Sequence, residues 1–387
     1  MVLILLKILL LINFTLFMAG FIFSFIYGSK KNKKMKNKKL TGKAGNITTI
    51  IPIKFGTERS LNNVLGVLKS QPNKNCVVIV SLESEEEEIF DELKNLERKY
   101  RNLKIVISGE SGSRMGKAHN MNEAFKFVET EFVAFKDDDV TITKNNYIDF
   151  FSKFENSNVG GGFAPAFYCT DGKPDKMIEI ITNYYFTEQL IKFAEGLKLN
   201  FCAGAFMMFR KEAIDNSGGL EKILYNIADD ASLGKLLSSK GYSILLSDIP
   251  VYMESEYSGI RSTAQHINKW MVIIKKFLGK DYYFLPFTFQ LSNVFWLSLM
   301  LVIFFAQNIY LLMLPLVIII DKIITSLYID SHFLKKRFNI FHYISIVILG
   351  IFQTFAWIIS LPQSTIVWAG KKYKIGKGGK IHSIIKI

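Results

Sequence analysis

The sequence predicts an α/β domain with a mostly parallel sheet, flanked by apolar segments long enough to enter a membrane. Short β-branched or aromatic runs alternate with amphipathic helical stretches between residues 46 and 280. The two flanks, residues 1–28 and 281–365, are apolar instead. The 387 residues are 49% hydrophobic, which is sufficient for one globular domain and several membrane segments.

The N-terminal flank is expected to be an uncleaved membrane anchor. Residues 2–27 form a nearly unbroken apolar run, and a bilayer crossing requires about 20 such residues. A cleavable signal would place its positive charge before a shorter apolar core, whereas here the lysine-rich stretch Lys30–Lys39 follows the run. The positive-inside rule then places the rest of the chain in the cytosol, at a bacterial inner membrane or its equivalent. We expect the anchor at 1–28 and a basic juxtamembrane linker at 29–45.

The middle region is expected to be one domain that covers residues 46–280. Strands are predicted at 46–53, 76–80, 103–107 and 131–136, and helices at 61–70, 85–101 and 118–128. The acidic stretch Glu83–Glu88 is interpreted as the negative first turn of the second helix. Gly160–Gly162 is not followed by the Lys-Ser/Thr pair of a phosphate-binding loop, so it is interpreted as a tight turn.

Three aspartates follow the strand at 131–136, at the edge where open α/β sheets bind their ligands. Because side chains alternate along an extended chain, Asp137 and Asp139 are expected to share a face and Asp138 to point the other way. Two carboxylates on one face repel each other unless a cation lies between them. Oxygen ligands favour Mg²⁺ or Mn²⁺, which often accompany a phosphate-bearing substrate. The alternative is a solvated acidic turn or an N-cap cluster.

The C-terminal flank contains candidate membrane spans at 284–305, 308–328 and 340–361. Three full crossings would carry the basic tail, residues 366–387, to the outside, against the positive-inside rule. One of the three is therefore expected to be interfacial or re-entrant, and the aromatic stretch 281–290 is the candidate approach.

The net charge of +14 is concentrated in two lysine-rich stretches, 30–39 and 371–387, neither of which contains an acidic residue. A nucleic-acid-binding protein would spread a basic stripe over its folded domain. Juxtamembrane lysines instead attract anionic lipid headgroups, with about 1 kcal/mol for each lysine. We therefore expect an anionic membrane surface as a partner, and no nucleic acid. Cys76, Cys169 and Cys202 lack zinc spacing and are interpreted as buried, reduced residues.

Four blocks of sequence carry a family resemblance. They are Ile50–Lys54; Gly116–Asn122 with Asp137–Asp139; Cys202–Arg210 with Gly218–Leu220 and Ala228–Asp230; and Val367–Tyr373. In this order and with flanking apolar segments, the blocks resemble membrane-bound family 2 glycosyltransferases, especially the ceramide glucosyltransferase-like branch. The resemblance implies a GT-A-like (Rossmann-like) fold.

The resemblance also implies a reaction, the metal-dependent, inverting transfer of a hexose from a UDP-sugar to a lipid hydroxyl of a ceramide-like or glycerolipid acceptor. Asp230 is implied as the catalytic base. Asp137 and Asp139 are implied as ligands of Mg²⁺ or Mn²⁺. The implied nucleotide-sugar-binding residues are Pro52, Glu83, Lys117, Asn120, Asp137, Asp138, His266, Lys269 and Trp270.

Two positions depart from the family pattern. Glu83 stands near the place where the family has a base-contacting aspartate. The sequence from His266 to Trp270 replaces the family's Gln/Arg-x-x-Arg-Trp, and Lys269 lacks the bidentate fork of arginine.

Structural interpretations compete with the functional ones. Asp229 and Asp230 are candidate helix caps, and both uses can hold if Asp229 caps and Asp230 catalyses. Trp270 is alternatively an interfacial anchor, and His266 a surface histidine. The aromatic stretch 184–193 is first a core helix and second a wall of a lipid-acceptor groove.

Two rival functions remain open. A processive polysaccharide synthase would need a channel of many helices, and the C-terminal spans are too few for one. A catalytically inactive membrane scaffold is suggested by the two departures from the family pattern. The intact set of Asp137, Asp139 and Asp230 argues against the scaffold.

Overall fold

The computed structural model describes residues 45–169, 176–196, 198–254, 259–285, 294–299, 313–336 and 338–386. The predicted anchor at 1–28 lies outside these residues, as do the linker up to residue 44 and most of the predicted span at 284–305.

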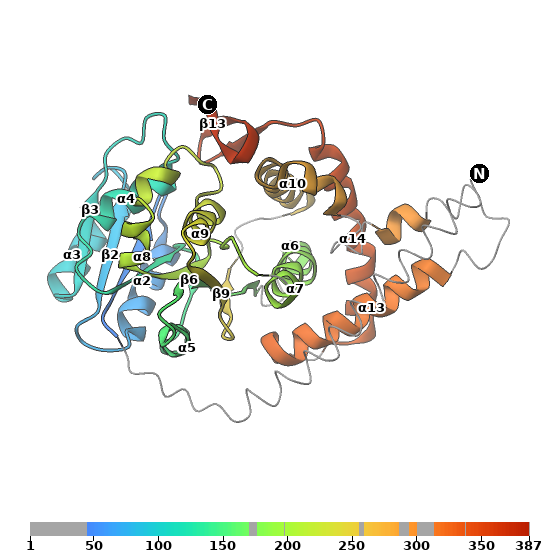
Figure 1. Ribbon diagram of the computed structural model, residues 1–387, viewed down its shortest axis with the longest axis horizontal. Helices are drawn as coiled ribbons and strands as arrows, with labels where there is room; N and C mark the ends of the chain where they lie inside the picture. Colours follow the sequence, from blue (N-terminus) through green and yellow to red (C-terminus); the bar gives the residue numbers. More distant parts are fainter. Residues whose placement is uncertain are drawn as a thin grey trace.

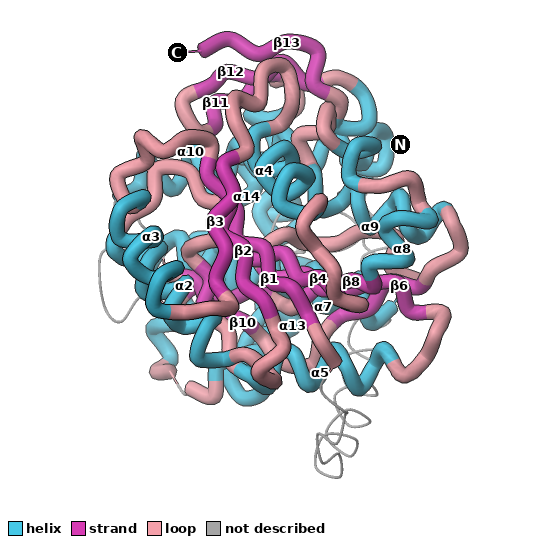
Figure 2. Tube along the Cα trace, turned by 90° about the vertical axis from the view of Figure 1, so that its left-hand side faces the viewer, coloured by secondary structure: helices cyan, strands magenta, loops and turns pink. Residues whose placement is uncertain are grey.

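A seven-stranded, mostly parallel sheet forms the centre of the domain, as predicted (Figure 2). Its strands, in spatial order, are β3 (Leu103–Ile107), β2 (Val77–Leu82), β1 (Ile47–Pro52), β4 (Phe132–Lys136), β8 (Phe206–Arg210), β6 (Val159–Phe163) and β9 (Ser243–Leu246). The first four strands are parallel to one another, and β8 runs antiparallel to both of its neighbours. The parallel half therefore presents the ends of β1, β2 and β4 along one edge.

Helices cover both faces of this sheet, and each face has its own apolar core. One core includes side chains of α2 (Glu58–Ser70), α3 (Phe90–Lys99) and α5 (Lys144–Phe154). The other includes side chains of α4 (Gly116–Phe125), α8 (Lys211–Asn216) and α9 (Asp229–Ser239). Burial on both faces explains why the predicted strands are continuous apolar runs.

The acidic stretch before α3 differs from its prediction. The helix begins at Phe90, so residues 85–88 are a turn rather than its first turn. The carboxylate of Glu87 accepts a hydrogen bond of 2.9 Å from the backbone N–H of Phe55, which follows β1. The carboxylate of Glu87 therefore accepts a hydrogen bond from a neighbouring loop and does not cap the helix. The spacing of residues in the sequence does not reveal this contact between distant segments.

The interpretation of Gly160–Gly162 as a tight turn is wrong, because these residues form the centre of β6. Large neighbours lie directly over them: a Cβ on Gly161 would be 2.0 Å from Cδ1 of Phe209, and one on Gly160 would be 2.6 Å from Cβ of Tyr242. The glycines are thus required by close packing inside the sheet.

A second group of elements packs beside the main sheet. It contains a small sheet of β5 (Val140–Thr141), β10 (Val251–Met253) and β7 (Ala166–Tyr168), and a helical segment made of α6 (Lys176–Ile181), the π-helix η1 (Thr182–Thr187) and α7 (Glu188–Gly196). The 3₁₀ turn η2 (Leu220–Ile223) packs instead on α4 and α9. The long amphipathic helix α10 (Gly259–Leu278) and the 3₁₀ turn η3 (Gly279–Phe284) follow. The aromatic residues Tyr184 and Tyr185 are fully buried, as a core helix predicts.

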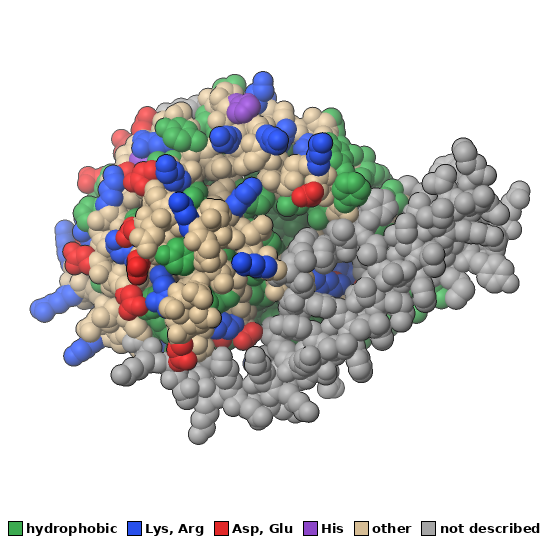
Figure 3. Space-filling view, viewed as in Figure 1, with side chains coloured by type: hydrophobic (Ala, Val, Ile, Leu, Met, Phe, Trp, Pro, Cys, Tyr) green, Lys and Arg blue, Asp and Glu red, His purple; other side chains and the backbone are tan. Residues whose placement is uncertain are grey.

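Two apolar helices then pack against this second group of elements, α13 (Met313–Ile329), extended by the π-turn η5 (Asp330–Leu334), and α14 (Ile340–Ser360). Among the described residues, only α14 is long and apolar enough to cross a membrane. Each helix has exposed apolar side chains, which in α14 include Phe341, Ile348 and Ile359. Figure 3 shows hydrophobic side chains gathered at the upper right of the face in view, where α14 lies in Figure 1.

The opposite face of α13 is charged and buried against α7. Lys322 forms a 2.5 Å ion pair with Glu188, which also pairs with Lys192 at 2.8 Å. These contacts attach the predicted span at 308–328 to the α/β domain on one side.

The C-terminal residues return to the domain as a three-stranded antiparallel sheet (Figures 1 and 2). It consists of β11 (Thr365–Trp368), β12 (Lys371–Ile375) and β13 (Ile381–Lys386), with the 3₁₀ turn η6 (Lys377–Gly379). The backbone N–H of Ile381 donates to the carbonyl of Tyr225 at 2.8 Å, and that of Ile227 to the carbonyl of Gly379 at 2.9 Å. The basic tail is therefore a folded part of the domain that contains the predicted active site.

Candidate active site

The predicted site residues converge at the carboxyl edge of the parallel half of the sheet. Lys54 lies two residues after β1, Glu83 directly follows β2, and Asp137 directly follows β4. Because β1 lies between β2 and β4, these three side chains start from adjacent strands. This edge is where α/β sheets bind their ligands.

Lys117 occupies the centre of an acidic cluster at this edge. Its Nζ lies 2.5 Å from Oδ1 of Asp137 and 4.0 Å from Oδ2 of Asp229. Burial lowers the pKa of Lys117, but Asp137, Asp229 and Asp230 outweigh burial and hold that pKa well above its ordinary value. Lys117 is the second residue of α4, so the turn that begins this helix aims the ammonium group at the end of β4.

The three consecutive aspartates lie in a turn after β4, in which the backbone N–H of Val140 donates to the carbonyl of Asp137 at 3.2 Å. The predicted alternation of an extended chain therefore does not run through them. Asp137 faces Lys117, whereas Asp138 accepts a 2.6 Å hydrogen bond from the hydroxyl of Ser60 on α2. Burial and the neighbouring Asp137 and Asp138 raise the pKa of Asp139 to about 7. Asp138 thus anchors a helix, and Asp139 carries negative charge that the cluster does not fully compensate.

A divalent cation fits this uncompensated charge. Among the described residues, no group of three His, Cys, Asp or Glu side chains converges as a complete metal site. Mg²⁺ commonly takes one or two protein carboxylates and completes its octahedron with water and substrate phosphate oxygens. Asp137 and Asp139 would supply that smaller set, and burial together with the neighbouring carboxylates raises the pKa of Asp139.

Asp230 lies on the opposite side of Lys117, in the first turn of α9. The predicted capping role of Asp229 is wrong: the N-cap is Ala228, and Asp229 is the first helical residue. Both carboxylates instead lie at the positive end of the helix dipole, which favours their charge. Burial and Asp229 raise the pKa of Asp230 to about 7, although Lys117 opposes this shift.

Gly204 is a site residue that the sequence did not single out. A Cβ at this position would lie 3.0 Å from Oδ2 of Asp230 and 3.2 Å from Nζ of Lys117. The absence of a side chain at Gly204 therefore leaves the space that the side chains of Asp230 and Lys117 both border. The signal in the sequence was the run of small residues Cys202–Ala205, which was noticed only as part of a family block.

The helix α10 brings His266, Lys269 and Trp270 to the same region. Burial lowers the pKa of Lys269 to about 8, while Asp139 and Asp137 pull that pKa upward. Its ammonium lies 5.0 Å from the ring centroid of Trp368, on the C-terminal sheet. Lys269 is thus within electrostatic reach of the acidic cluster.

Packing explains the two aromatic neighbours of Lys269. The ring of His266 is buried, 4.3 Å from the ring of Trp270, and burial lowers the pKa of His266 to about 3, so this side chain is neutral at physiological pH. Trp270 packs edge-on against Phe186 at 5.1 Å. The interpretation of His266 as a surface histidine is therefore wrong.

The remaining predicted residues, Pro52, Asn120 and Glu83, lie at or beside the ends of β1 and β2. Pro52 ends β1 and is buried. Asn120 accepts a 2.7 Å hydrogen bond from Ser108, whose backbone N–H donates to the carbonyl of Leu82. Asn120 therefore fixes the loop between β3 and α4 beside Glu83, which forms an ion pair with Lys54.

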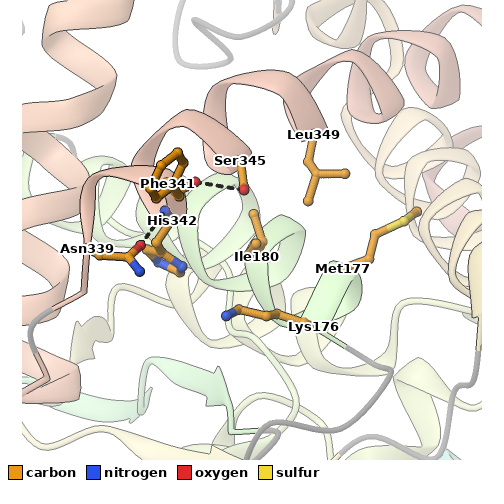
Figure 4. A pocket seen from close by; sticks show the side chains of 8 residues that line it. All are labelled: Lys176, Met177, Ile180, Asn339, Phe341, His342, Ser345 and Leu349. Atoms are coloured by element: carbon orange, nitrogen blue, oxygen red, sulfur yellow. Dashed lines mark hydrogen bonds between the residues drawn. The ribbon is translucent and has the colours of Figure 1, made fainter.

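A cavity of about 360 Å³ lies elsewhere, between the start of α6 and the start of α14 (Figure 4). Its lining is half polar, including one lysine, and half apolar. The lining residues are Lys176, Met177, Ile180, Asn339, Phe341, His342, Ser345 and Leu349. None of the predicted site residues contributes to it, so this cavity is separate from the acidic cluster.

Comparison with known proteins identifies the family. Residues 13–381 match the sequence model of the family described as glycosyl transferase family 21. The chain belongs to this family. Ceramide glucosyltransferase 1 of Caenorhabditis elegans is 23% identical, with 87% of this chain and 73% of the relative covered. Ceramide glucosyltransferase 3 of the same organism is 22% identical over 58% of this chain and 50% of the relative.

A solved mannosyltransferase from Pyrobaculum calidifontis, in complex with GDP-Man and Mn²⁺, has a TM-score of 0.49 and 14% identity, over 91% of this chain and 98% of that one. The family match and the ceramide glucosyltransferase relatives confirm the predicted ceramide glucosyltransferase-like enzyme, a hexosyltransferase.

Proposed function

We propose that this family 21 enzyme transfers a hexose from a UDP-sugar to the hydroxyl of a membrane lipid, with inversion at the anomeric carbon. The observation that carries the proposal is the cluster of Asp137, Asp139, Asp229 and Asp230 around Lys117 at the sheet edge. The relatives' names, ceramide glucosyltransferases, support a lipid acceptor and a glucose-like sugar.

Asp230 is the proposed general base. The acceptor hydroxyl passes its proton to the Asp230 carboxylate while its oxygen attacks the anomeric carbon from the face opposite the leaving group. The bond from that carbon to the diphosphate breaks, and UDP leaves with the bonding electrons. A carboxylate with a pKa near 7 is well matched to this role, because it accepts the proton readily while about half of the molecules still have it ionised at neutral pH.

Lys117 and Lys269 are proposed to stabilise the charge that develops on the departing diphosphate. Both ammonium groups are close to the carboxylates of Asp137 and Asp139, where the metal is proposed to bind. A divalent ion held by Asp137 and Asp139 would supply further charge neutralisation for the diphosphate. Lys117 also holds Asp137 in place before substrate arrives.

The enzyme is tested with UDP-glucose, ceramide in mixed micelles and Mn²⁺, and the products are analysed by mass spectrometry. Replacement of Asp230 by Asn should reduce turnover by about 10²–10⁴-fold, which is the usual contribution of a general base. Asp215→Asn is the matched control, because Asp215 is exposed on α8 and forms a surface ion pair with Lys211. Equal activity of Asp230→Asn and wild type would refute the assignment, and a soluble polymer product would favour a polysaccharide synthase.

The proposed location is a membrane surface with the α/β domain in the cytosol. Because β11–β13 pack on that domain, the chain must leave and return on the same side between residues 281 and 365. This implies an even number of crossings in that interval, or helices that only lie in the interface. The exposed apolar side chains of α13 and α14 fit lipid contact on one side, while the buried faces of these helices contact the domain.

This topology has a direct test. Single cysteines introduced at the exposed positions Lys94 and Lys372, in a chain without its native cysteines, should react with a membrane-impermeant maleimide in the same vesicle orientation. Labelling of the two positions from opposite sides would contradict the proposed topology.

A further inference from the structure

Lys371 is a buried lysine contributed by the C-terminal sheet. Only 6% of the residue is exposed, although both neighbouring lysines of β12, Lys372 and Lys374, are exposed. Its Nζ donates a 2.9 Å hydrogen bond to the hydroxyl of Ser111 and lies 4.0 Å from Oε1 of Glu83. The C-terminal sheet therefore reaches the loop between β3 and α4 with a positive charge.

The strand position of Lys371 is one that favours an apolar residue. Side chains alternate along β12, and Tyr373 and Ile375, which share the inward face with Lys371, pack in an apolar cluster with Met115 and Val272. An aliphatic side chain would complete this packing without the cost of burying an ammonium group. A role in packing alone therefore does not explain the lysine.

An ammonium group lies at each carboxylate oxygen of Glu83. Lys54 pairs with Oε2, and Nζ of Lys371 lies 4.0 Å from Oε1. The Glu83 carboxylate lies between two ammonium groups, which places a hydrogen-bond acceptor between donors. The uracil edge has the complementary pattern, with an N–H donor between two carbonyl acceptors.

The position of this cluster along the sheet edge indicates which part of a nucleotide it meets. Lys54 and Glu83 follow β1 and β2, whereas Asp137 follows β4 on the other side of β1. With the diphosphate at Asp137, the nucleoside extends over β1 and β2. We infer that Lys371 is a nucleotide-binding residue, whose ammonium group contacts a uracil carbonyl beside Glu83. This inference rests on the proposed use of a UDP-sugar.

The test is calorimetric titration of UDP, UMP and GMP into the full-length protein in detergent micelles with Mn²⁺. Lys371→Met keeps most of the apolar stem and removes the charge, and it should weaken UDP and UMP binding alike by about tenfold, which is typical of a lost hydrogen bond from a charged group. Lys371→Met should also reduce the ratio of the affinity for UMP to the affinity for GMP. Lys371→Arg should retain most of the affinity, and Lys372→Met, the exposed neighbour, should bind as wild type does.

Several results would overturn the inference. If Lys371→Met weakens UDP but leaves UMP unchanged, the contact is with the β-phosphate and the nucleoside assignment is wrong. If Ser111→Ala, which keeps the charge, reproduces the whole loss, Lys371 acts only by holding the loop. If the wild type binds UDP and Lys371→Met binds it equally well, Lys371 is not part of the site. Absence of UDP binding by the wild type would instead refute the proposed function itself.

Discussion

Replacement of Gly204 by alanine is expected to lower the catalytic activity and to leave the stability of the fold nearly unchanged. The added Cβ would lie 3.0 Å from Oδ2 and 3.3 Å from Cβ of Asp230, and 3.2 Å from Nζ of Lys117. Ordinary contacts of a methyl group begin near 3.4 Å, so both partners must move by a few tenths of an ångström. The carboxylate of Asp230 is tied to the backbone N–H of Ala231 at 2.7 Å, and Lys117 to Asp137, so the movement disturbs the proposed base and its electrostatic partner together.

The expected loss follows from the sensitivity of catalysis to geometry. A misplacement of about 1 Å costs roughly 10²-fold in rate, so a shift of a few tenths to half an ångström predicts a loss of about 3- to 30-fold in kcat. Stability should change little. Gly204 does not have a positive φ, and alanine reduces the entropy of the unfolded chain by the equivalent of about 0.4–1 kcal/mol, which offsets the crowding.

The assay measures UDP release from UDP-glucose with ceramide in mixed micelles, together with thermal unfolding of the same samples. Gly66→Ala is the matched control, because Gly66 lies inside α2 with nothing within 4 Å of the new Cβ. This control should be stabilised by about 0.5–1 kcal/mol and keep full activity. If Gly204→Ala retains the wild-type kcat, or if its activity falls only in proportion to its folded fraction, the positions of Asp230 and Lys117 beside Gly204 do not govern catalysis.

Three further predictions concern charge and packing. The donor KM of the wild type should rise above pH 8, because Lys269, with a pKa of about 8, then loses the positive charge that faces Asp137 and Asp139; His266 is already neutral and Trp368 does not titrate. Lys269→Arg should remove this rise, and an unchanged pH profile in that variant would contradict the assignment. Gly161→Ala should lower the free energy of unfolding by about 1–3 kcal/mol in chemical denaturation, because the methyl overlaps the ring of Phe209. Lys322→Met should lower it by about 3–5 kcal/mol, since Glu188 loses a buried partner, and a wild-type midpoint would show that α13 is not held by this pair.

Local pattern was sufficient for the parallel half of the domain. The strands that became β1, β2, β3 and β4 were predicted within two residues, because each is a short apolar run bounded by polar residues. Asp137 and Asp138 do have different partners, Lys117 and Ser60, but Asp138 lies in a turn, so strand alternation is not the reason. The strand predictions depend only on neighbours in sequence.

Contacts between distant segments account for the predictions that failed or were absent. The glycines of β6 look like a turn because the rings that cover them, Phe209 and Tyr242, come from other strands and loops. Gly204 and Ser60 show no pattern of their own, and each becomes a site residue only when Asp230 or Asp138 approaches. Sequence spacing contains no information about such pairings.

The lysines of the C-terminal sheet have different environments, which their number in the sequence does not reveal. By composition, the six lysines after residue 370 form one basic stretch suited to anionic lipid. The alternation of β12 divides them, because Lys372 and Lys374 face outward and remain available to a membrane surface, whereas Lys371 is buried beside Ser111 and Glu83. Since β11–β13 follow the apolar helices directly, the segment that reaches the proposed donor site is continuous with the segment that meets the lipid. The helix proposed to contact the membrane, α14, and the sheet that carries Lys371 are therefore joined by only a few residues of chain, Leu361–Ser364.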